Sequence, residues 1–260
     1  MIDIHCHILP GLDDGPAELD GSIAFGRAAA AAGIRTAVAT PHVREDFPFE
    51  LDRIAAGVQE LNHALAEAGV ELRVVAGAEV AISKLAELDD TTLRGLCLGD
   101  GPYLLVESPY AHALEWVEAG LEDVRSRGMR PVLAHPERAP SFLSDPERLE
   151  RIVAGDVLCS VTAASMHGVF GRRIRRFTRD LFERGLVHNV ASDAHGPEHR
   201  RPELAAGFDG LESDCPGLSE QAGWFTSDVP EAILAGRDLP SRPEPARRRS
   251  WLARTLGRAG

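Results

Sequence analysis

The sequence lacks any apolar run approaching the roughly 20 residues that a helix needs to cross a bilayer. We also expect no secretory leader, because Met1 runs directly into Ile-Asp-Ile-His. Cysteine is scarce and includes no C-x-x-C pair, which excludes a disulfide framework and favours reduced, buried thiols. The four are Cys6, Cys97, Cys159 and Cys215. We therefore expect a cytoplasmic protein.

Basic residues are few as well. The chain has 28 Lys+Arg against 40 Asp+Glu, a formal net charge of −12, and Lys84 is its only lysine. A general nucleic-acid binder would normally be basic, so nucleic acid is not an expected partner. The chain is 44% hydrophobic over 260 residues, which permits the core of one large α/β domain.

Short apolar segments with strand character alternate with segments whose apolar residues recur every three or four positions. The predicted strands cover residues 1–7, 36–40, 72–76, 103–106, 131–134, 158–161 and 187–191. The predicted helices cover residues 17–32, 51–65, 114–124, 149–153 and 174–181, and residues 81–98 are less regular. Such alternation predicts parallel strands joined by helical crossovers.

Polar side chains of metal-ligand type follow six of these seven predicted strands. In the first strand, Asp3, His5 and His7 share one face, opposite Ile4 and Cys6. The other five strand ends offer His42, Glu79, Glu107, His135 and the pair Asp193 and His195. The carboxyl ends of parallel strands meet at one rim of a barrel, so we expect these groups to form a metal site.

The ligand-type residues lie in five short motifs: His5-Cys-His7 with Asp13-Asp-Gly-Pro16, Thr40-Pro-His42, Gly77-Ala-Glu79, His135-Pro-Glu-Arg138 and Ser192-Asp-Ala-His195. Together these motifs resemble the polymerase-and-histidinol-phosphatase (PHP) superfamily. Within it, residues 1 to about 240 are most similar to the bacterial manganese-dependent protein-tyrosine phosphatases of capsule and exopolysaccharide operons. The resemblance implies a distorted seven-stranded (β/α)7 barrel with three metal ions at its mouth.

The resemblance also implies nine ligands: His5, His7, Asp14, His42, Glu79, Glu107, His135, Asp193 and His195. Glu79 would bridge two ions, and Asp14 is preferred to Asp13 because it directly precedes Gly-Pro. Mixed nitrogen and oxygen ligands without thiolate suit Mn²⁺ or Fe²⁺, with Zn²⁺ as a further choice.

Two arginines are candidates for binding phosphate. Arg138 lies three residues past His135, and a guanidinium matches phosphate oxygens two at a time. Arg200 resembles the second phosphate-binding arginine of the family, and its neighbour Arg201 stays open as the alternative. The alternative for each of Arg138 and Arg200 is a surface salt bridge without a role in binding phosphate.

Clustered metal ions cancel the charge of a phosphate monoester and lower the pKa of bound water from about 15.7 toward about 7. We therefore expect in-line attack by a metal-bridging hydroxide, without a phosphoenzyme. No cysteine has an arginine six positions later, which argues against a cysteine nucleophile. The expected substrate is phosphotyrosine on a protein, and the resemblance implies a bacterial tyrosine kinase that controls polysaccharide synthesis.

Three other functions compete with this one. A histidinol-phosphate phosphatase or another small-molecule PHP phosphatase would share the metals and differ only in its pocket. A barrel amidohydrolase also begins with His-x-His, and many use a modified lysine, for which Lys84 is the only candidate. A non-catalytic metal-binding regulator would keep the fold without the reaction, since a fold alone never fixes an activity.

Residues 241–260 differ in character from the rest. The segment from Ser241 to Ser250 is rich in proline and arginine, and we expect this tail to be disordered. A solvated tail is the simpler interpretation, and contact with an anionic membrane or a partner is the alternative. The sequence thus predicts a PHP metallophosphatase domain over residues 1–240 and a basic tail over 241–260.

Overall fold

The computed structural model describes residues 1–47, 49–109 and 115–243. Its strands are β1 (Ile2–Cys6), β2 (Thr36–Ala39), β3 (His42–Val43), β4 (Arg73–Ala76), β5 (Glu79–Ala81), β6 (Tyr103–Glu107), β7 (Arg130–Ala134), β8 (Leu158–Thr162) and β9 (Asn189–Ala191). Neighbouring strands pair in parallel, in two sheets of order β1-β2-β4 and β3-β5-β6-β7-β8-β9. The predicted α/β class is therefore confirmed.

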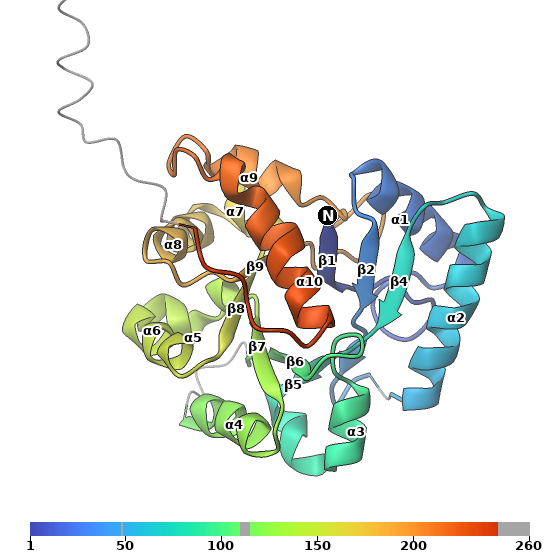
Figure 1. Ribbon diagram of the computed structural model, residues 1–260, viewed down its shortest axis with the longest axis horizontal. Helices are drawn as coiled ribbons and strands as arrows, with labels where there is room; N and C mark the ends of the chain where they lie inside the picture. The colour runs from blue at the N-terminus through green and yellow to red at the C-terminus, as the bar shows by residue number, and fades with distance from the viewer. Residues whose placement is uncertain (48, 110–114, 244–260) are drawn as a thin grey trace, which may run out of the picture.

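The helices connect the strands and cover their outer side (Figure 1). The α-helices are α1 (Leu19–Ala31), α2 (Leu51–Glu67), α3 (Asp90–Gly95), α4 (Glu115–Ser126), α5 (Pro140–Ser144), α6 (Pro146–Ala154), α7 (Ala163–Met166), α8 (Arg172–Glu183), α9 (Ala205–Leu211) and α10 (Val229–Leu234). Shorter turns are the 3₁₀ helices η1 (Ile82–Glu87), η2 (Pro136–Arg138) and η3 (Ser219–Gln221) and the π-helix η4 (Trp224–Asp228). No described helix is long and apolar enough to span a membrane.

The described residues form nine strands in two sheets rather than the expected seven strands. The predicted strands 36–40 and 72–76 appear as β2 and β4, and the short strands β3 and β5, which were not predicted, follow the breaks at Pro41 and Gly77. Proline has no N–H to donate to a ladder. At Gly77 a Cβ atom would lie 2.8 Å from Val38 Cγ1, so this close approach excludes a side chain. The backbone still pairs across the first break, where Glu79 N donates to Pro41 O at 3.1 Å.

The carboxyl end of β1 joins the segment that follows β9. His7 N donates to Ala194 O at 2.8 Å, and Asp193 N donates to His5 O at 2.9 Å. The first and last strands of the chain are thus neighbours, and they bring His5, His7 and Asp193 to the same edge.

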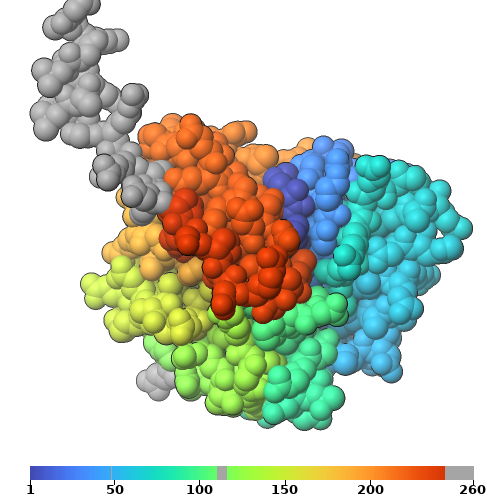
Figure 2. Space-filling view, viewed as in Figure 1, coloured from blue at the N-terminus to red at the C-terminus, as the bar shows by residue number. Residues whose placement is uncertain are grey.

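The C-terminal segment covers the opposite edge. In Figure 2 the orange and red segment lies across the centre of the visible face, between the blue N-terminal part and the green and yellow middle of the chain. A cavity of about 320 Å³ there is lined by residues near the amino ends of strands, Ile2, Thr36 and Arg73, and by Glu231 and Leu234 of α10. This cavity lies at the amino ends of the strands, whereas the polar cluster lies at their carboxyl ends.

Arg242 belongs to the segment that the sequence predicts to be a disordered tail. Its Nη2 donates to Val187 O at 2.6 Å, and its guanidinium carbon lies 5.2 Å from the centre of the Trp224 ring. The start of the predicted tail thus packs on the domain. Residues 244–260 lie outside the described part of the chain.

Asn62 of α2 satisfies the exposed edge of the smaller sheet. Its side-chain amide donates to Val74 O at 2.8 Å and accepts from Val74 N at 2.9 Å. We expect Asn62→Ala to lower the free energy of unfolding by about 1–3 kcal/mol, because both backbone groups of Val74 lose their partner. Urea denaturation measures this loss. Gln59→Ala, at an exposed position about one turn earlier in α2, is the control. Equal stability of the two variants would contradict the assigned role of Asn62.

Candidate active site

All nine side chains predicted as metal ligands converge at the carboxyl ends of the strands. They form four overlapping groups, within each of which the ligand-type atoms lie no more than 4.8 Å apart. The groups are His7, Asp14, His42 and His195; His5, His7 and Asp193; His5, Glu79 and His135; and His42, Glu79 and Glu107. Residues as far apart in the sequence as His5 and His195 thus lie in one cluster, as expected for the carboxyl ends of parallel strands.

Glu79, the first residue of β5, lies at the centre of the cluster and is fully buried. Its Oε1 is 2.8 Å from His135 Nε2. Its Oε2 is 3.0 Å from His42 Nδ1, 3.2 Å from His5 Nε2 and 3.5 Å from His7 Nε2. One carboxylate therefore faces four imidazoles, and Glu79 is shared by two of the four groups.

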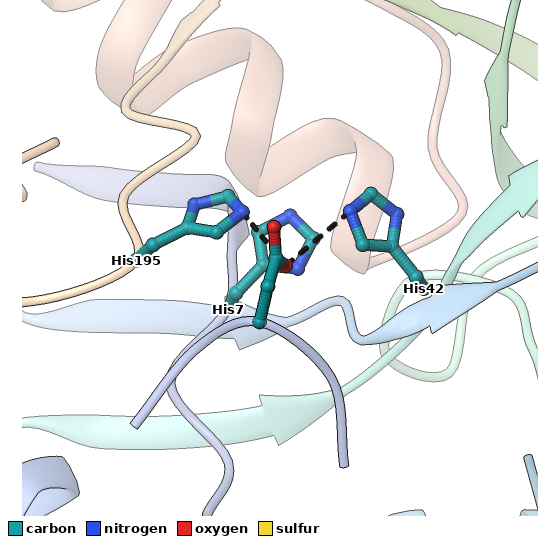
Figure 3. A group of neighbouring side chains, drawn as sticks. His7, His42 and His195 are labelled. Atoms are coloured by element: carbon teal, nitrogen blue, oxygen red, sulfur yellow. Dashed lines mark ion pairs between the residues drawn. The ribbon is translucent and has the colours of Figure 1, made fainter. Parts of the chain in front are cut away.

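The outer group lies nearest to solvent. Figure 3 shows the rings of His7, His42 and His195 turned toward one another. Asp14 Oδ1 is 3.1 Å from His195 Nε2 and 3.6 Å from His42 Nε2, and these ion pairs are dashed in Figure 3. The Asp14 side chain is 47% exposed, so this end of the cluster opens to solvent.

Asp13 has a different position from Asp14. Its side chain is 1% exposed, and its Oδ2 lies 2.6 Å from His7 Nδ1 and accepts from His42 N at 3.0 Å. Its Oδ1 accepts from Gly15 N at 3.0 Å. Burial disfavours the charged carboxylate, but the hydrogen bond with His7 outweighs it and lowers the pKa of Asp13 to about 2. Asp13 thus orients the imidazole of His7 and holds the backbone of His42, a role that the sequence analysis missed.

A second buried carboxylate, Asp3, supports the opposite side of the cluster. Its Oδ1 accepts from Ser192 N at 3.0 Å and from His5 N at 3.3 Å, and Ser192 Oγ donates to its Oδ2. These bonds tie β1 to the loop that carries Asp193. The signal for Asp3 was present in the sequence, because it lies on the same strand face as His5 and His7.

Backbone strain also gathers at this edge. Four described residues other than glycine have positive φ, and three of them are His135 (32°), Asp193 (50°) and Arg200 (50°). Such conformations cost free energy and persist only where the surrounding structure holds them, typically at functional sites. The strain therefore marks the same residues as the geometry does.

Burial and neighbouring charge lower the pKa of two imidazoles of the cluster, whereas the hydrogen bond with Asp13 outweighs burial and holds the pKa of His7 well above its usual range. Burial, aided by the charge of Arg138, lowers the pKa of His135 to about 4. Burial, aided by the charge of His7, lowers the pKa of His195 to about 2. Burial opposes ionisation of Glu79, but the charges of His5 and His135 hold its pKa well below the usual range. Neutral imidazoles and charged carboxylates are the forms that bind metal.

Glu107, the last residue of β6, is the exception among the carboxylates. Burial, with the charge of Glu79 as the next cause, raises its pKa to about 7. Two carboxylates that share one buried place repel each other unless a cation lies between them. This arrangement fits a divalent ion in the group formed by His42, Glu79 and Glu107.

Arg138 and Arg200 both reach Asp193. Arg138 Nη1 is 2.8 Å from Asp193 Oδ2, and Arg200 Nη2 donates to the same oxygen. Arg200 Nη1 lies 2.9 Å from His195 Nε2. A guanidinium has no acceptor, so His195 Nε2 must accept and presents its lone pair to a cation.

Arg201 points elsewhere. Its side chain is 59% exposed, and its contacts are with Glu198 O at 3.2 Å and Glu203 at 3.7 Å. Of the two neighbouring arginines, only Arg200 contacts residues of the cluster.

Glu137 is a further residue that the sequence analysis missed. It is fully buried between His135 and Arg138, and its Oε1 accepts from Thr162 N at 2.9 Å and from Ser165 Oγ at 2.7 Å. These bonds fasten η2, which carries Arg138, to the end of β8. Thr162 to Ser165 follow the one predicted strand that has no ligand-type residue at its end. In the structure, Thr162 and Ser165 support η2 through their bonds to Glu137.

No cysteine and no further histidine of the described residues belongs to the four ligand groups. All four cysteines are buried and outside disulfides, and burial raises the pKa of the Cys6 and Cys97 thiols, which disfavours a thiolate nucleophile. Lys84 Nζ pairs with Glu87 at 2.7 Å. His63, His167 and His199 are exposed, His188 accepts from Cys159 N, and His112 lies outside the described residues.

The fold and the site define a parallel α/β protein with a candidate metal centre at the carboxyl edge of its strands. The model of the family described as "Capsular polysaccharide synthesis, CpsB/CapC" matches residues 1–218. The chain belongs to the CpsB/CapC family, and the predicted resemblance is confirmed.

Individual relatives agree with this membership. The tyrosine-protein phosphatase YwqE of Bacillus subtilis is 33% identical over 251 residues, which cover 96% of this chain and 98% of the relative. The tyrosine-protein phosphatase CpsB of Streptococcus pneumoniae is 30% identical over 222 residues, 80% of this chain and 88% of the relative. A crystal structure from work on YwqE and CpsB, described as metal-dependent tyrosine phosphatases, matches with a TM-score of 0.83 at 33% identity, covering 95% of this chain and all of that chain (100%).

Asp13 gives a test of the metal centre that does not depend on activity. We expect Asp13→Ala to weaken Mn²⁺ binding by about 10- to 100-fold, because the imidazole of His7 and the backbone of His42 lose the group that holds them. Metal analysis after dialysis against defined Mn²⁺ concentrations measures the affinity. Asp20→Ala removes the same charge from an exposed position of α1 and is the control. Equal affinities of the two variants would exclude this role for Asp13.

Proposed function

We propose that this chain is a metal-dependent phosphomonoester hydrolase that removes phosphate from phosphotyrosine on a protein. The observation that carries the proposal is the convergence of nine nitrogen and oxygen ligands with two guanidinium groups at one edge of the fold. Membership in the CpsB/CapC family and the relatives named tyrosine-protein phosphatase support the same activity.

The nine residues His5, His7, Asp14, His42, Glu79, Glu107, His135, Asp193 and His195 would hold three divalent ions, with Glu79 shared between two of them. Imidazole and carboxylate donors without thiolate favour Mn²⁺, with Fe²⁺ or Zn²⁺ as alternatives. Ions bound there would neutralise the phosphate dianion and lower the pKa of water from about 15.7 toward about 7.

The protein's own groups complete the site. Arg138 and Arg200 bind phosphate oxygens and orient the ester, because a guanidinium forks onto two oxygens at once. Both already contact one anionic oxygen, that of Asp193, so they can converge on a phosphate in the same place. Glu137 holds the turn that presents Arg138. The reaction needs no phosphoenzyme, since water is the nucleophile.

The broader setting follows from the family. We propose that the substrate is a bacterial tyrosine kinase that regulates capsule or exopolysaccharide synthesis, and that the reaction takes place in the cytoplasm, where cysteines outside disulfides stay reduced. We further infer that β2 with β3, and β4 with β5, act as two interrupted strands of a distorted seven-stranded barrel formed by residues 1–240. The arginine-rich end of the tail, residues 244–260, is the part of the chain most suited to an anionic membrane.

Arg200 and Arg201 form a matched pair for testing phosphate binding. We expect Arg200→Ala to lower kcat/KM for a phosphotyrosine peptide about 10²- to 10³-fold, the usual loss when one donor to a developing charge is removed. Arg201→Ala should stay within about twofold, because its side chain faces solvent. Steady-state kinetics measure both variants. The reverse order of effects would transfer the role to Arg201.

The substrate is tested by comparing turnover of a phosphotyrosine peptide and of histidinol phosphate, with Mn²⁺ added. We expect hydrolysis of the peptide, and its loss when the metal is removed by a chelator. Glu79→Ala should reduce both metal content and activity to near background, because the shared carboxylate is gone. Exclusive activity on histidinol phosphate would refute the proposed substrate, and a Glu79→Ala protein as active as its parent would refute the site.

A further inference from the structure

Three exposed arginines lie on the first half of α8. Arg172, Arg173 and Arg176 share one face of the helix, since residues three and four apart are neighbours. We call them the arginine face. Among the described residues, none of the three guanidinium groups takes part in an ion pair. In a chain with a formal net charge of −12, such a concentration of unpaired positive charge is unexpected.

The other arginines of the helix have structural partners. Arg175 Nη2 donates to Gly210 O at 2.7 Å and pairs with Asp214 at 2.6 Å. Arg179 pairs with Asp180 and, at 3.8 Å, with Glu183. Packing and ion pairs therefore explain Arg175 and Arg179 but leave the arginine face without a structural role.

The stability of α8 does not explain the arginine face either. Cations are unfavourable in the first turn of a helix, where the backbone N–H groups carry partial positive charge. No acidic residue lies in the first turn and no basic residue in the last, which contains Glu183 instead. The charges of α8 thus oppose its dipole.

The N-terminal end of α8, where the arginine face begins, lies near the candidate active site. Phe170, two residues before α8, lies with its ring centre 4.9 Å from the guanidinium carbon of Arg138. Gly168 and Gly171 have φ of 90° and 95° and lie in the turn between α7 and α8. Helix α8 packs against η2. Val169 in the same turn is 63% exposed. Two extended residues span at most about 7 Å, so the first arginine begins close to the phosphate-binding Arg138.

We propose that the arginine face binds acidic side chains that flank the phosphotyrosine of the protein substrate. The proposal rests on the proposed function, because it takes the phosphorylated tyrosine to be bound beside Arg138. Guanidinium groups match carboxylates two atoms at a time. Val169 offers an apolar contact at the same rim. The occupant is thus an acidic peptide segment, and the surface selects tyrosines in acidic surroundings.

Binding of unphosphorylated peptides tests this surface without requiring hydrolysis. The probes are two fluorescein-labelled tyrosine peptides that differ only in having glutamate or glutamine around the tyrosine, measured by fluorescence anisotropy with the full chain. We expect the glutamate peptide to bind about tenfold more tightly at low salt, and the difference to vanish as salt screens the charges. In R172E/R173E/R176E the preference should be lost.

Charge reversal leaves folding of the variant intact for a physical reason, since glutamate in the first turn favours the helix dipole. The control R27E/R53E/R73E removes three exposed arginines on other elements and should keep the tenfold preference. Equal affinity of the parent for both peptides, or loss of the preference in the control as well, would overturn the proposal.

Two further measurements distinguish acidic-peptide binding from membrane binding and test the proposed activity separately. If R172E/R173E/R176E keeps the peptide preference but loses binding to vesicles containing phosphatidylserine, the arginine face binds membrane and the proposal is wrong. Turnover of the phosphorylated glutamate peptide by the parent tests the proposed function independently. A parent that binds the glutamate peptide selectively but hydrolyses no phosphotyrosine would refute the activity and retain the acidic docking surface.

Discussion

The rest of the structure depends on the interaction between the buried carboxylate of Glu79 and the four imidazoles around it. Its oxygens lie between 2.8 and 3.5 Å from ring nitrogens of His5, His7, His42 and His135. A buried charge is costly unless opposite charge or a metal compensates for it, and Glu107 and Asp193 add further carboxylates at the same place. The protein interior is thus arranged around a concentration of charge that cations can neutralise.

The parallel strands make this concentration possible because their carboxyl ends meet at one edge. Backbone hydrogen bonds join the end of β1 to the segment after β9, which brings His7 and Asp193 together. Asp3 and Asp13 then fix the side chains from behind, one through Ser192 and the other through His7. The positive φ of His135 and Asp193 shows that the backbone is strained to hold them. Rigid support of this kind is what a multi-ligand metal site requires.

Much of the fold and most of the site could be predicted from the sequence. Alternating strand and helix segments gave the parallel α/β class, and ligand-type residues after strands gave the cluster, because strand ends share an edge regardless of their distance along the chain. The short strands β3 and β5 after Pro41 and Gly77 were not predicted, since they depend on contacts between distant segments, such as that between position 77 and Val38. The supporting role of Glu137 was missed for a similar reason, because its partners Thr162 and Ser165 come from another strand end.

The sequence by itself determined the residue types available for chemistry and their places at the ends of strands, because periodicity and spacing are local properties of the chain. Only the tertiary structure decided between neighbours with the same chemistry. Asp13 is buried behind His7 while Asp14 faces His195, and Arg200 contacts Asp193 while Arg201 faces solvent. Adjacent residues differ in this way because side-chain direction, burial and partners are set by packing between distant segments, which no local pattern encodes.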